Sequence, residues 1–268
     1  MRKFSFGMAL ALAMVGSSSA AWAQTNNTPD TKKTQKAPAA AAAFNPRDLS
    51  GIWMDDHARP NKVVERYWIY KFTPDEPPMT AWGQEQFAKV KSGFGEHPFP
   101  IKETNDPVYL SCQPAGFPRA IAHPFPFQIL QVPGEVLVIF EWDSLRHQIF
   151  VDGRKHDEAL GPSYMGDSIG HWEGDTLVAD TVNFNEKTWL DRMGHPHSDQ
   201  LHVIERIRRV DKDHLVDDMT IDDPKAYTKP WTAHLTFAVH AKWTLQEQFC
   251  EDENTFEGIE SNEVKPAK

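Results

Sequence analysis

The chain has 268 residues, a formal net charge of −10 at neutral pH and a hydrophobic share of 40%. An acidic balance of this size argues against nucleic acid and anionic membranes as partners, and we expect neither. Beyond the N-terminal region about 200 residues are left, which is the size of one domain with a substantial core.

The first 43 residues have the composition of an export signal followed by a linker. Two basic residues precede an apolar run too short to span a bilayer, and Ala21-Trp22-Ala23 is typical of a signal-peptide cleavage site. We expect residues 1–23 to be a signal peptide, and residues 24–43, which have almost no large apolar side chains, to be a disordered linker. Removal of residues 1–23 would take away two positive charges and no acid, so the net charge would change from −10 to −12. The mature protein is expected to be soluble and periplasmic or secreted, with no membrane insertion.

A β-rich domain is expected over residues 44–252, with a disordered tail over residues 253–268. Its first two strands are predicted at residues 50–55 and 63–72, where apolar side chains alternate with polar ones. The tail is acidic and poor in large apolar residues, so it cannot contribute to a core.

A helix is predicted over residues 78–92, followed by a long loop over residues 96–133. Thr80 is a suitable N-cap, and Gly93 and Gly95 stop the helix. Its apolar stripe consists of Ala81, Trp82, Phe87 and Val90. Prolines recur through the next segment, so we predict an irregular loop that carries binding surface rather than regular structure.

Strands joined by tight turns are predicted from residue 134 onward. Residues 134–143 have apolar side chains on both faces, which is typical of a central strand. Glu173-Gly174-Asp175 and Asp211-Lys212-Asp213 are predicted hairpin turns. The other strands are predicted at residues 146–151, 168–172, 176–184, 201–210, 214–221 and 233–245. In total we expect about nine strands.

Successive antiparallel hairpins with one long early excursion favour a mainly β fold. We expect a single antiparallel lipocalin-like barrel or a strongly curved sheet, with one short helix and a long proline-rich loop, and a β-sandwich as the alternative. Gly51-Ile52-Trp53 resembles the Gly-x-Trp opening of lipocalin-like barrels. That resemblance implies a cup with an interior ligand cavity.

The chain has two cysteines, Cys112 and Cys250. In an exported protein an even pair is expected to form a disulfide, and two buried free thiols are the alternative. In chain-entropy theory, closing so long a loop contributes at most about 4–5 kcal/mol of stability. The bridge would tie the last strand to the early loop region.

Several motifs resemble those of known exported proteins. The clearest are Gly170-His171-Trp172-Glu173-Gly174-Asp175-Thr176-Leu177-Val178, Pro196-His197-Ser198 with Leu201-His202 and Glu205-Arg206, and Thr220-Ile221-Asp222-Asp223-Pro224 leading to Tyr227-Thr228-Lys229-Pro230-Trp231. Together they resemble a widespread family of exported bacterial proteins of unassigned function, over residues 48–250. The resemblance implies export and supplies no catalytic assignment, and His195 is less clearly part of its pattern than His197 and His202.

Titratable side chains are concentrated in a turn that leads into a strand: His195, His197, Asp199, His202, Glu205 and Arg206. One hypothesis is a divalent metal such as zinc bound by His195, His197 and His202, with Asp199 or Glu205 as a further ligand. His202 and Glu205 point to opposite faces of a regular strand, so they can share one ion only across a bulge. The alternative is a polar surface without a ligand. No other cofactor is expected.

A second hypothesis is acid–base catalysis without a metal. If alternation places His202 and Arg206 inside the barrel, these side chains and His197 could act with a nearby carboxylate to abstract a proton and stabilise the resulting anion. The candidate carboxylates are Glu141, Asp180 and Glu205. Burial beside apolar neighbours would raise the pKa of Glu141, whereas an ion pair with Arg146 would make Glu141 structural.

The chain is rich in aromatic residues, with nine tryptophans and sixteen phenylalanines. Four of them lie where they could wall the mouth of a pocket: Trp82, Phe117, Phe125 and Trp231. One function that fits is a periplasmic enzyme of the lyase, isomerase or hydrolase type, acting on an apolar, aromatic or sugar-like substrate. The other is a non-catalytic, lipocalin-like binding protein for a lipophilic ligand. Catalysis requires several titratable groups in one cavity, whereas binding requires apolar walls with one or two polar anchors.

Overall fold

The computed structural model describes residues 44–55, 71–95, 97–157 and 159–250. All of these residues belong to one compact unit, Ala43–Lys268. The expected signal peptide, linker and C-terminal tail, and most of the strand predicted at residues 63–72, lie outside the described residues. Within the described ranges, no helix has the length and apolar character needed to cross a membrane.

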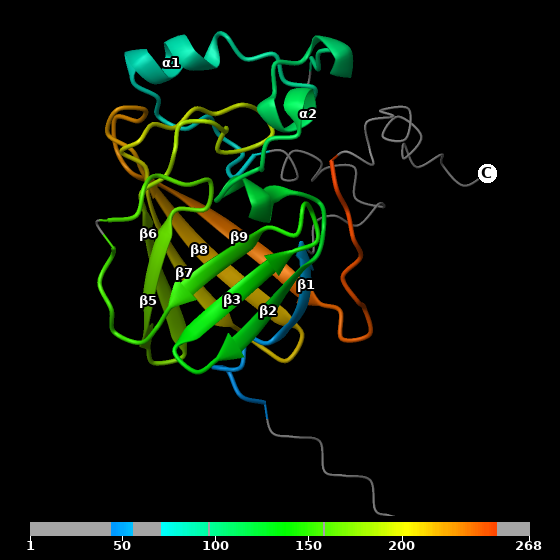
Figure 1. Ribbon diagram of the computed structural model, residues 1–268, viewed down its shortest axis with the longest axis vertical. Helices are drawn as coiled ribbons and strands as arrows, with labels where there is room; N and C mark the ends of the chain where they lie inside the picture. Colours follow the sequence, from blue (N-terminus) through cyan, green and yellow to red (C-terminus); the bar gives the residue numbers. More distant parts are fainter. Residues whose placement is uncertain (1–43, 56–70, 96, 158, 251–268) are drawn as a thin grey trace, which may run out of the picture. The chain divides into compact units, whose positions relative to one another are not determined.

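Nine strands of the described residues close into a barrel in chain order (Figure 1). They are β1 (Gly51–Asp55), β2 (Phe127–Val132), β3 (Glu135–Phe140), β4 (Arg146–Phe150), β5 (Asp167–Glu173), β6 (Thr176–Val182), β7 (His202–Arg209), β8 (His214–Asp222) and β9 (Trp231–Val239). Neighbouring strands are antiparallel except β4 and β5, which run parallel and pair at two positions. β1 pairs with both β2 and β9 and closes the ring. The prediction of a mainly β, lipocalin-like barrel is confirmed.

The strand positions follow the alternation in the sequence, with two corrections. β2 lies inside the loop predicted over residues 96–133, because Pro126 and Pro133 flank this strand rather than interrupt it. β9 ends at Val239, although the alternation continues to residue 245. β8 begins at His214, which pairs with Ala238, so β8 offers no partner for the residues that follow Val239.

The inner face of the barrel is filled by side chains. Trp53, Leu177, Val203 and Phe237 are at most 2% exposed, and they meet in one core cluster. Among the described residues, the space left inside is about 10 Å³, which is room for about one water molecule. The cup implied by the Gly-x-Trp resemblance is therefore not found, because buried apolar side chains fill the interior of this barrel.

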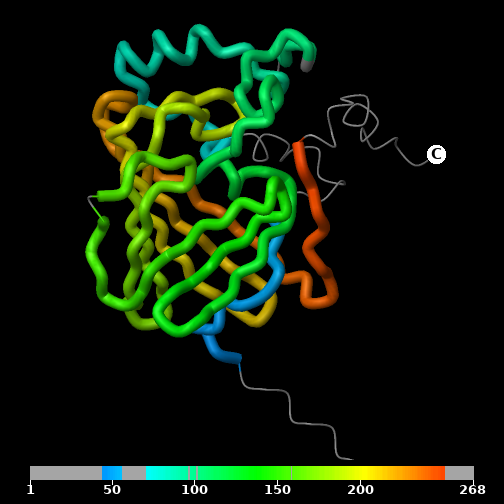
Figure 2. Tube along the Cα trace, in the orientation of Figure 1, coloured from blue at the N-terminus to red at the C-terminus, as the bar shows by residue number. Residues whose placement is uncertain are grey.

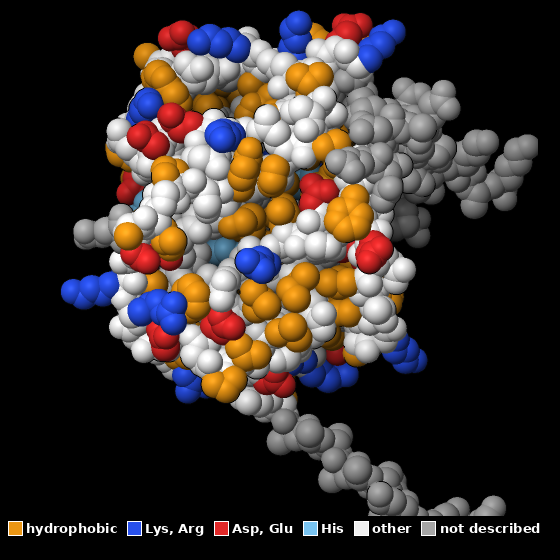
Figure 3. All heavy atoms as spheres, in the orientation of Figure 1, with side chains coloured by type: hydrophobic (Ala, Val, Ile, Leu, Met, Phe, Trp, Pro, Cys, Tyr) orange, Lys and Arg blue, Asp and Glu red, His pale blue; other side chains and the backbone are white. Residues whose placement is uncertain are grey.

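The outer face of β3 is apolar as well, as its sequence predicts. Leu137 and Ile139 alternate with the buried Val136 and Val138 and are themselves half-buried. Figure 3 shows apolar side chains gathered over this part of the barrel. Both faces of the strand are thus apolar, although only one of them contacts the core.

Three segments gather at one end of the barrel (Figure 2). We call residues 71–125, 183–201 and 223–230 together the cap. The first of them contains four short helices: α1 (Ala81–Phe87), η3 (Ile101–Glu103), α2 (Pro107–Ser111) and η4 (Arg119–Ala122). The irregular loop predicted from residue 96 is therefore partly helical. The predicted N-cap is confirmed, since the Thr80 hydroxyl accepts a hydrogen bond from the Gly83 amide at 3.1 Å.

Hydrogen bonds between the three segments fix the cap. The Thr80 hydroxyl donates to the Lys225 carbonyl at 2.6 Å. The Ser198 hydroxyl donates to the buried Asp223 carboxylate at 2.8 Å, and the Tyr227 hydroxyl donates to the Pro196 carbonyl at the same distance. Each bond joins two different segments, so the loops after β6 and β8 hold α1 in place.

The predicted disulfide is confirmed. Cys112 follows α2 and is bonded to Cys250, with a Cα–Cα distance of 5.5 Å. The cysteines are 138 positions apart, so the bridge ties the segment after β9 back to the cap. Cys250 packs with Val108, Tyr109 and Trp142 in a second, smaller apolar cluster.

Candidate functional site

The histidine-rich segment is spread over separate environments. His195 and His197 are buried in the cap, where they are 1% and 5% exposed. The side chain of His202, at the start of β7, is 34% exposed. In the described part of the chain, no group of three or more His, Cys, Asp or Glu side chains is arranged to hold a metal ion. The structure therefore does not bring the three expected metal ligands together.

The acid–base hypothesis required the face of β7 with His202 and Arg206 to point into the barrel. In the structure the opposite face points inward. Val203, Glu205 and Ile207 are buried inside the barrel, whereas Arg206 is on the outer face. Arg206 donates to the Glu173 carboxylate at 2.8 Å, and both side chains are nearly half exposed. A packed interior selects the face with Val203 and Ile207, because burying Arg206 would leave a cation without solvent.

The outer face of the barrel holds His202 and Asp180 in a chain of polar contacts. His202 Nε2 lies 2.9 Å from Asp180 Oδ1, which is also 3.2 Å from His156 Nε2. His156 Nδ1 in turn lies 3.0 Å from Asp167 Oδ2. These side chains pair with one another rather than lining one of the clefts described below, so the structure brings together His202 and Asp180 of the predicted set and leaves His197 and Arg206 apart.

Glu141 has a structural partner. The residue directly follows β3, and its carboxylate accepts a hydrogen bond from the Gln246 amide at 2.8 Å. The bond helps to hold the segment after β9 against the end of β3, next to the pairing of Trp142 with Gln248. This placement accounts for Glu141 without a role in a cavity.

Glu205 points into the barrel and meets two other titratable groups. Its carboxylate lies 3.0 Å from His147 Nε2, and the His147 ring stacks on Phe117 with centroids 4.1 Å apart. Burial raises the pKa of the neighbouring Asp217 well above its ordinary value, and the negative charge of Glu205 raises it further. These groups form a closed polar cluster, since the space beside them is about 10 Å³.

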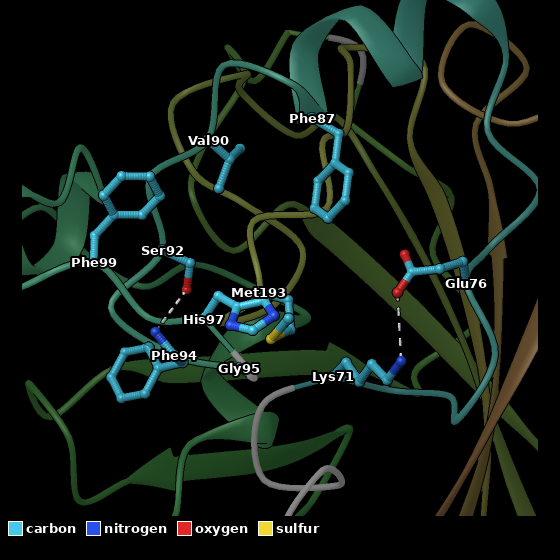
Figure 4. Close-up of a pocket in the computed structure, with 10 residues that line it drawn as sticks. All are labelled: Lys71, Glu76, Phe87, Val90, Ser92, Phe94, Gly95, His97, Phe99 and Met193. Atoms are coloured by element: carbon cyan, nitrogen blue, oxygen red, sulfur yellow. Dashed lines mark hydrogen bonds and ion pairs between the residues drawn. The ribbon is translucent and has the colours of Figure 1, made fainter.

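One cavity with room for a ligand is a cleft in the cap, which we call the cap cleft (Figure 4). Its volume is about 420 Å³, within the range of small-molecule sites. Three phenylalanines, a valine and a methionine supply apolar walls, and the polar lining comes from Lys71, Glu76, Ser92 and His97. The lining side chains are Lys71, Glu76, Phe87, Val90, Ser92, Phe94, His97, Phe99 and Met193, with Gly95 between them.

A buried histidine fixes the polar side of the cap cleft. His195 Nε2 lies 2.8 Å from the Glu76 carboxylate, and His195 Nδ1 lies 2.5 Å from the Asp191 carboxylate. Asp191 also accepts hydrogen bonds from the backbone amides of Met193, Gly194 and His195, at 3.0 to 3.2 Å. The imidazole stacks on the Phe87 ring, with centroids 4.8 Å apart. Both ring nitrogens thus face carboxylates across a rigid turn.

The charges of His195 and Glu76 are fixed over a wide pH range. Burial alone would lower the pKa of His195, but the charges and hydrogen bonds of Asp191 and Glu76 raise it to about 9. The hydrogen bond with His195 lowers the pKa of Glu76 to about 2, against a smaller opposing effect of burial. At neutral pH His195 is therefore an imidazolium held between two carboxylates.

His197 lies in a second cleft, on the other side of Val90 and Gly194. This cleft has a volume of about 380 Å³ and a more polar lining that includes Thr188. His197 Nε2 lies 3.3 Å from the Thr188 hydroxyl, and its Nδ1–H donates to the Ser198 carbonyl at 3.2 Å. Burial lowers the pKa of His197 and keeps the ring neutral. Both nitrogens are thus occupied by neutral neighbours.

Sequence reasoning missed most of the cap cleft. Among the expected aromatic wall residues, Trp82 lines the second cleft and Phe117 lies in the barrel, while the cap cleft uses Phe87, Phe94 and Phe99. Glu76 and His195 meet across 119 positions of sequence. The available signal was the pair of glycines around Phe94, which marks a loop with room for aromatic side chains on its surface.

Comparison of the chain with protein-family models, curated proteins and solved structures finds no significant match.

Proposed function

We propose that the protein is a non-catalytic, exported binding protein whose ligand, an apolar or aromatic small molecule, occupies the cap cleft. The observation that carries this proposal is the shape and lining of the cleft. It offers about 420 Å³ between three phenylalanine rings, Val90 and Met193, and its polar lining consists of Lys71, Glu76, Ser92 and His97. Pockets of this kind bury most of a small ligand and orient it through a few polar anchors.

The charges beside the cleft favour binding over proton transfer. A general base or acid works best when its pKa lies near the ambient pH. The pKa of His195 is about 9 and that of Glu76 is about 2, so neither group changes protonation between about pH 4 and pH 7. His195 with its two carboxylates, Glu76 and Asp191, therefore serves better as a rigid, charged wall than as a proton relay.

Export is the second part of the proposal. A disulfide persists in an oxidising compartment, and the Cys112–Cys250 bridge supports a periplasmic or secreted location together with the predicted signal peptide. The interior of the barrel is full, so the proposal places the ligand in the cap, where the closed sheet supplies a rigid base and the loops above it form the cleft.

The test is binding of N-phenyl-1-naphthylamine, a neutral aromatic dye whose fluorescence rises in apolar surroundings. Phe99 is 40% exposed and lines the cleft, so Phe99→Ala should remove part of the wall without disturbing the core. We expect the dye to bind the native protein and Phe99→Ala to weaken that binding at least about fivefold.

Phe44→Ala is the matched control, because Phe44 is 45% exposed and contacts Arg209 rather than the cleft. The control variant should bind the dye as the native protein does. If both variants weaken the binding equally, the cap cleft is not the site.

A further inference from the structure

The charged groups at the Lys71 end of the cap cleft are paired with one another. Glu76 accepts contacts at both carboxylate oxygens: Oε2 faces the protonated His195 at 2.8 Å, and Oε1 lies 3.4 Å from the Lys71 ammonium. Asp191 is engaged by His195 on the far side. His195 and Lys71 thus stand beside two carboxylates, whereas Arg192 stacks over Phe94 on the other side of the cleft.

The aromatic walls already carry cations of the protein itself. The guanidinium of Arg192 stacks over Phe94, with its central carbon 3.8 Å from the ring centroid. The imidazolium of His195 stacks on Phe87 in the same way, with an angle of 6° between the rings. A cationic ligand would compete with these contacts, and Glu76, the one acidic side chain among the described residues that line the cleft, is already paired with His195 and Lys71. Cation–π recognition of an ammonium ligand is thus disfavoured on two of the three rings.

Lys71 is the cation best placed to meet a ligand. An ammonium has three donors, and among the described residues the one acceptor for Lys71 is Glu76, at 3.4 Å. In Figure 4 the Lys71 side chain lies on the opposite side of the cleft from Phe94 and Phe99, with Phe87 and Met193 between them. The side chain is 14% exposed, so a salt bridge with a ligand there would be largely shielded from water.

We propose that the cap cleft binds aromatic or apolar acids, with the ligand's carboxylate or a similar anionic group on Lys71 and its apolar body between the phenylalanines. This inference rests on the proposed binding function and adds the charge of the ligand. Lys71 lies at one end of the cleft and Phe94 and Phe99 lie at the other, so the cleft fits an amphipathic acid whose charge lies at one end. A neutral apolar ligand would leave Lys71 without a new partner.

Two dyes separate the inference from the proposed function. 1-Anilinonaphthalene-8-sulfonate has the same aromatic skeleton as N-phenyl-1-naphthylamine and adds one sulfonate. We expect the sulfonated dye to bind the native protein at least about tenfold more tightly than the neutral dye, and this advantage to shrink as salt is added. Lys71→Met should weaken binding of the sulfonated dye about tenfold and leave binding of the neutral dye within about twofold.

The control variants separate an effect of the Lys71 charge from an effect on the structure of the cap. Lys71→Arg retains the positive charge and should retain the preference for the sulfonated dye. Lys212→Met removes an 81% exposed lysine from the turn between β7 and β8 and should change neither affinity. Near-ultraviolet circular dichroism of each variant checks that the cap keeps its packing.

Each contrary outcome has a distinct meaning. Equal affinities for the two dyes, or a Lys71→Met variant that keeps the preference for the sulfonated dye, would overturn the proposed anion site and leave the binding function in place. Equal weakening of both dyes by Lys71→Met would also overturn it, because Lys71 would then support the cleft rather than the charge. If neither dye binds the native protein, the binding function itself fails.

Discussion

His195 shows how one residue can be conspicuous in a sequence for a reason other than catalysis. Three histidines within a few positions suggest a metal site or a proton relay, because imidazole serves both. The structure separates them, and the carboxylates that hold His195 come from the same turn and from a segment far away in the chain. Spacing along the sequence identified the segment but could not supply the partners that decide its chemistry.

The charge of His195 predicts how stability depends on pH. The pKa of about 9 in the folded protein exceeds the ordinary value of 6.5, so the stabilisation is complete below about pH 6.5 and is lost as pH rises towards 9. We expect the pH-dependent part of the difference in free energy of unfolding between the native protein and His195→Gln, measured with urea, to be about 3 kcal/mol at pH 6 in favour of the native protein. It should be nearly absent at pH 9.5.

The matched control for this prediction is His171→Gln, because His171 is 65% exposed and pairs with Glu173 at the surface. That variant should follow the native protein at every pH. A constant difference between the native protein and His195→Gln from pH 6 to 9.5 would show that His195 is neutral in the folded state. The Glu76 pKa of about 2 affects stability at low pH. The stabilisation that Glu76 contributes is lost only as pH falls from about 4.5 towards 2.

At the scale of elements, the sequence predicted strands better than the faces they bury. Alternation located β7, yet both of its faces contain charged residues, so the pattern alone did not say which face is internal. β2 was predicted as part of a loop because prolines stand on both sides of it. Hairpin turns and the N-cap of α1 depend on residues close in sequence, and these were predicted correctly.

Gly194 joins two elements of the cap at very close range. Its φ is +97°, and a Cβ atom at this position would lie 2.3 Å from the Val90 side chain that separates the two clefts. Gly194→Ala should therefore destabilise the protein by about 1–3 kcal/mol more than Gly153→Ala. Gly153 is the matched control, because its φ of +84° imposes similar backbone strain while nothing lies within 4 Å of its Cβ position.

Thermal or urea unfolding of these variants checks the prediction, and a double variant identifies the cause. Adding Val90→Ala to Gly194→Ala removes the atoms that clash, so the two changes together should cost less than the sum of their separate effects. Equal stability of Gly194→Ala and Gly153→Ala would mean that the loop moves away from Val90 without resistance.

At the scale of the whole described unit, the barrel and the cap have different tasks. The largest apolar cluster fills the closed sheet, leaves about 10 Å³ of space inside it and continues into the cap, whereas the cap has open clefts of about 420 Å³ and 380 Å³. The sequence predicted the barrel because periodicity and turn residues are local signals. It did not predict the cap cleft, whose walls come from residues 71–99 and from Met193, because such contacts depend on the packing of loops.

The most direct test of this account follows two methionine methyl groups by nuclear magnetic resonance. Met193 lines the cap cleft, whereas Met219 is fully buried on β8 among the core residues of the barrel. In a sample with 13C-labelled methionine methyl groups, titration with N-phenyl-1-naphthylamine should shift the Met193 signal and leave the Met219 signal in place. A shift of Met219 with Met193 unchanged would place the ligand inside the barrel and contradict the account.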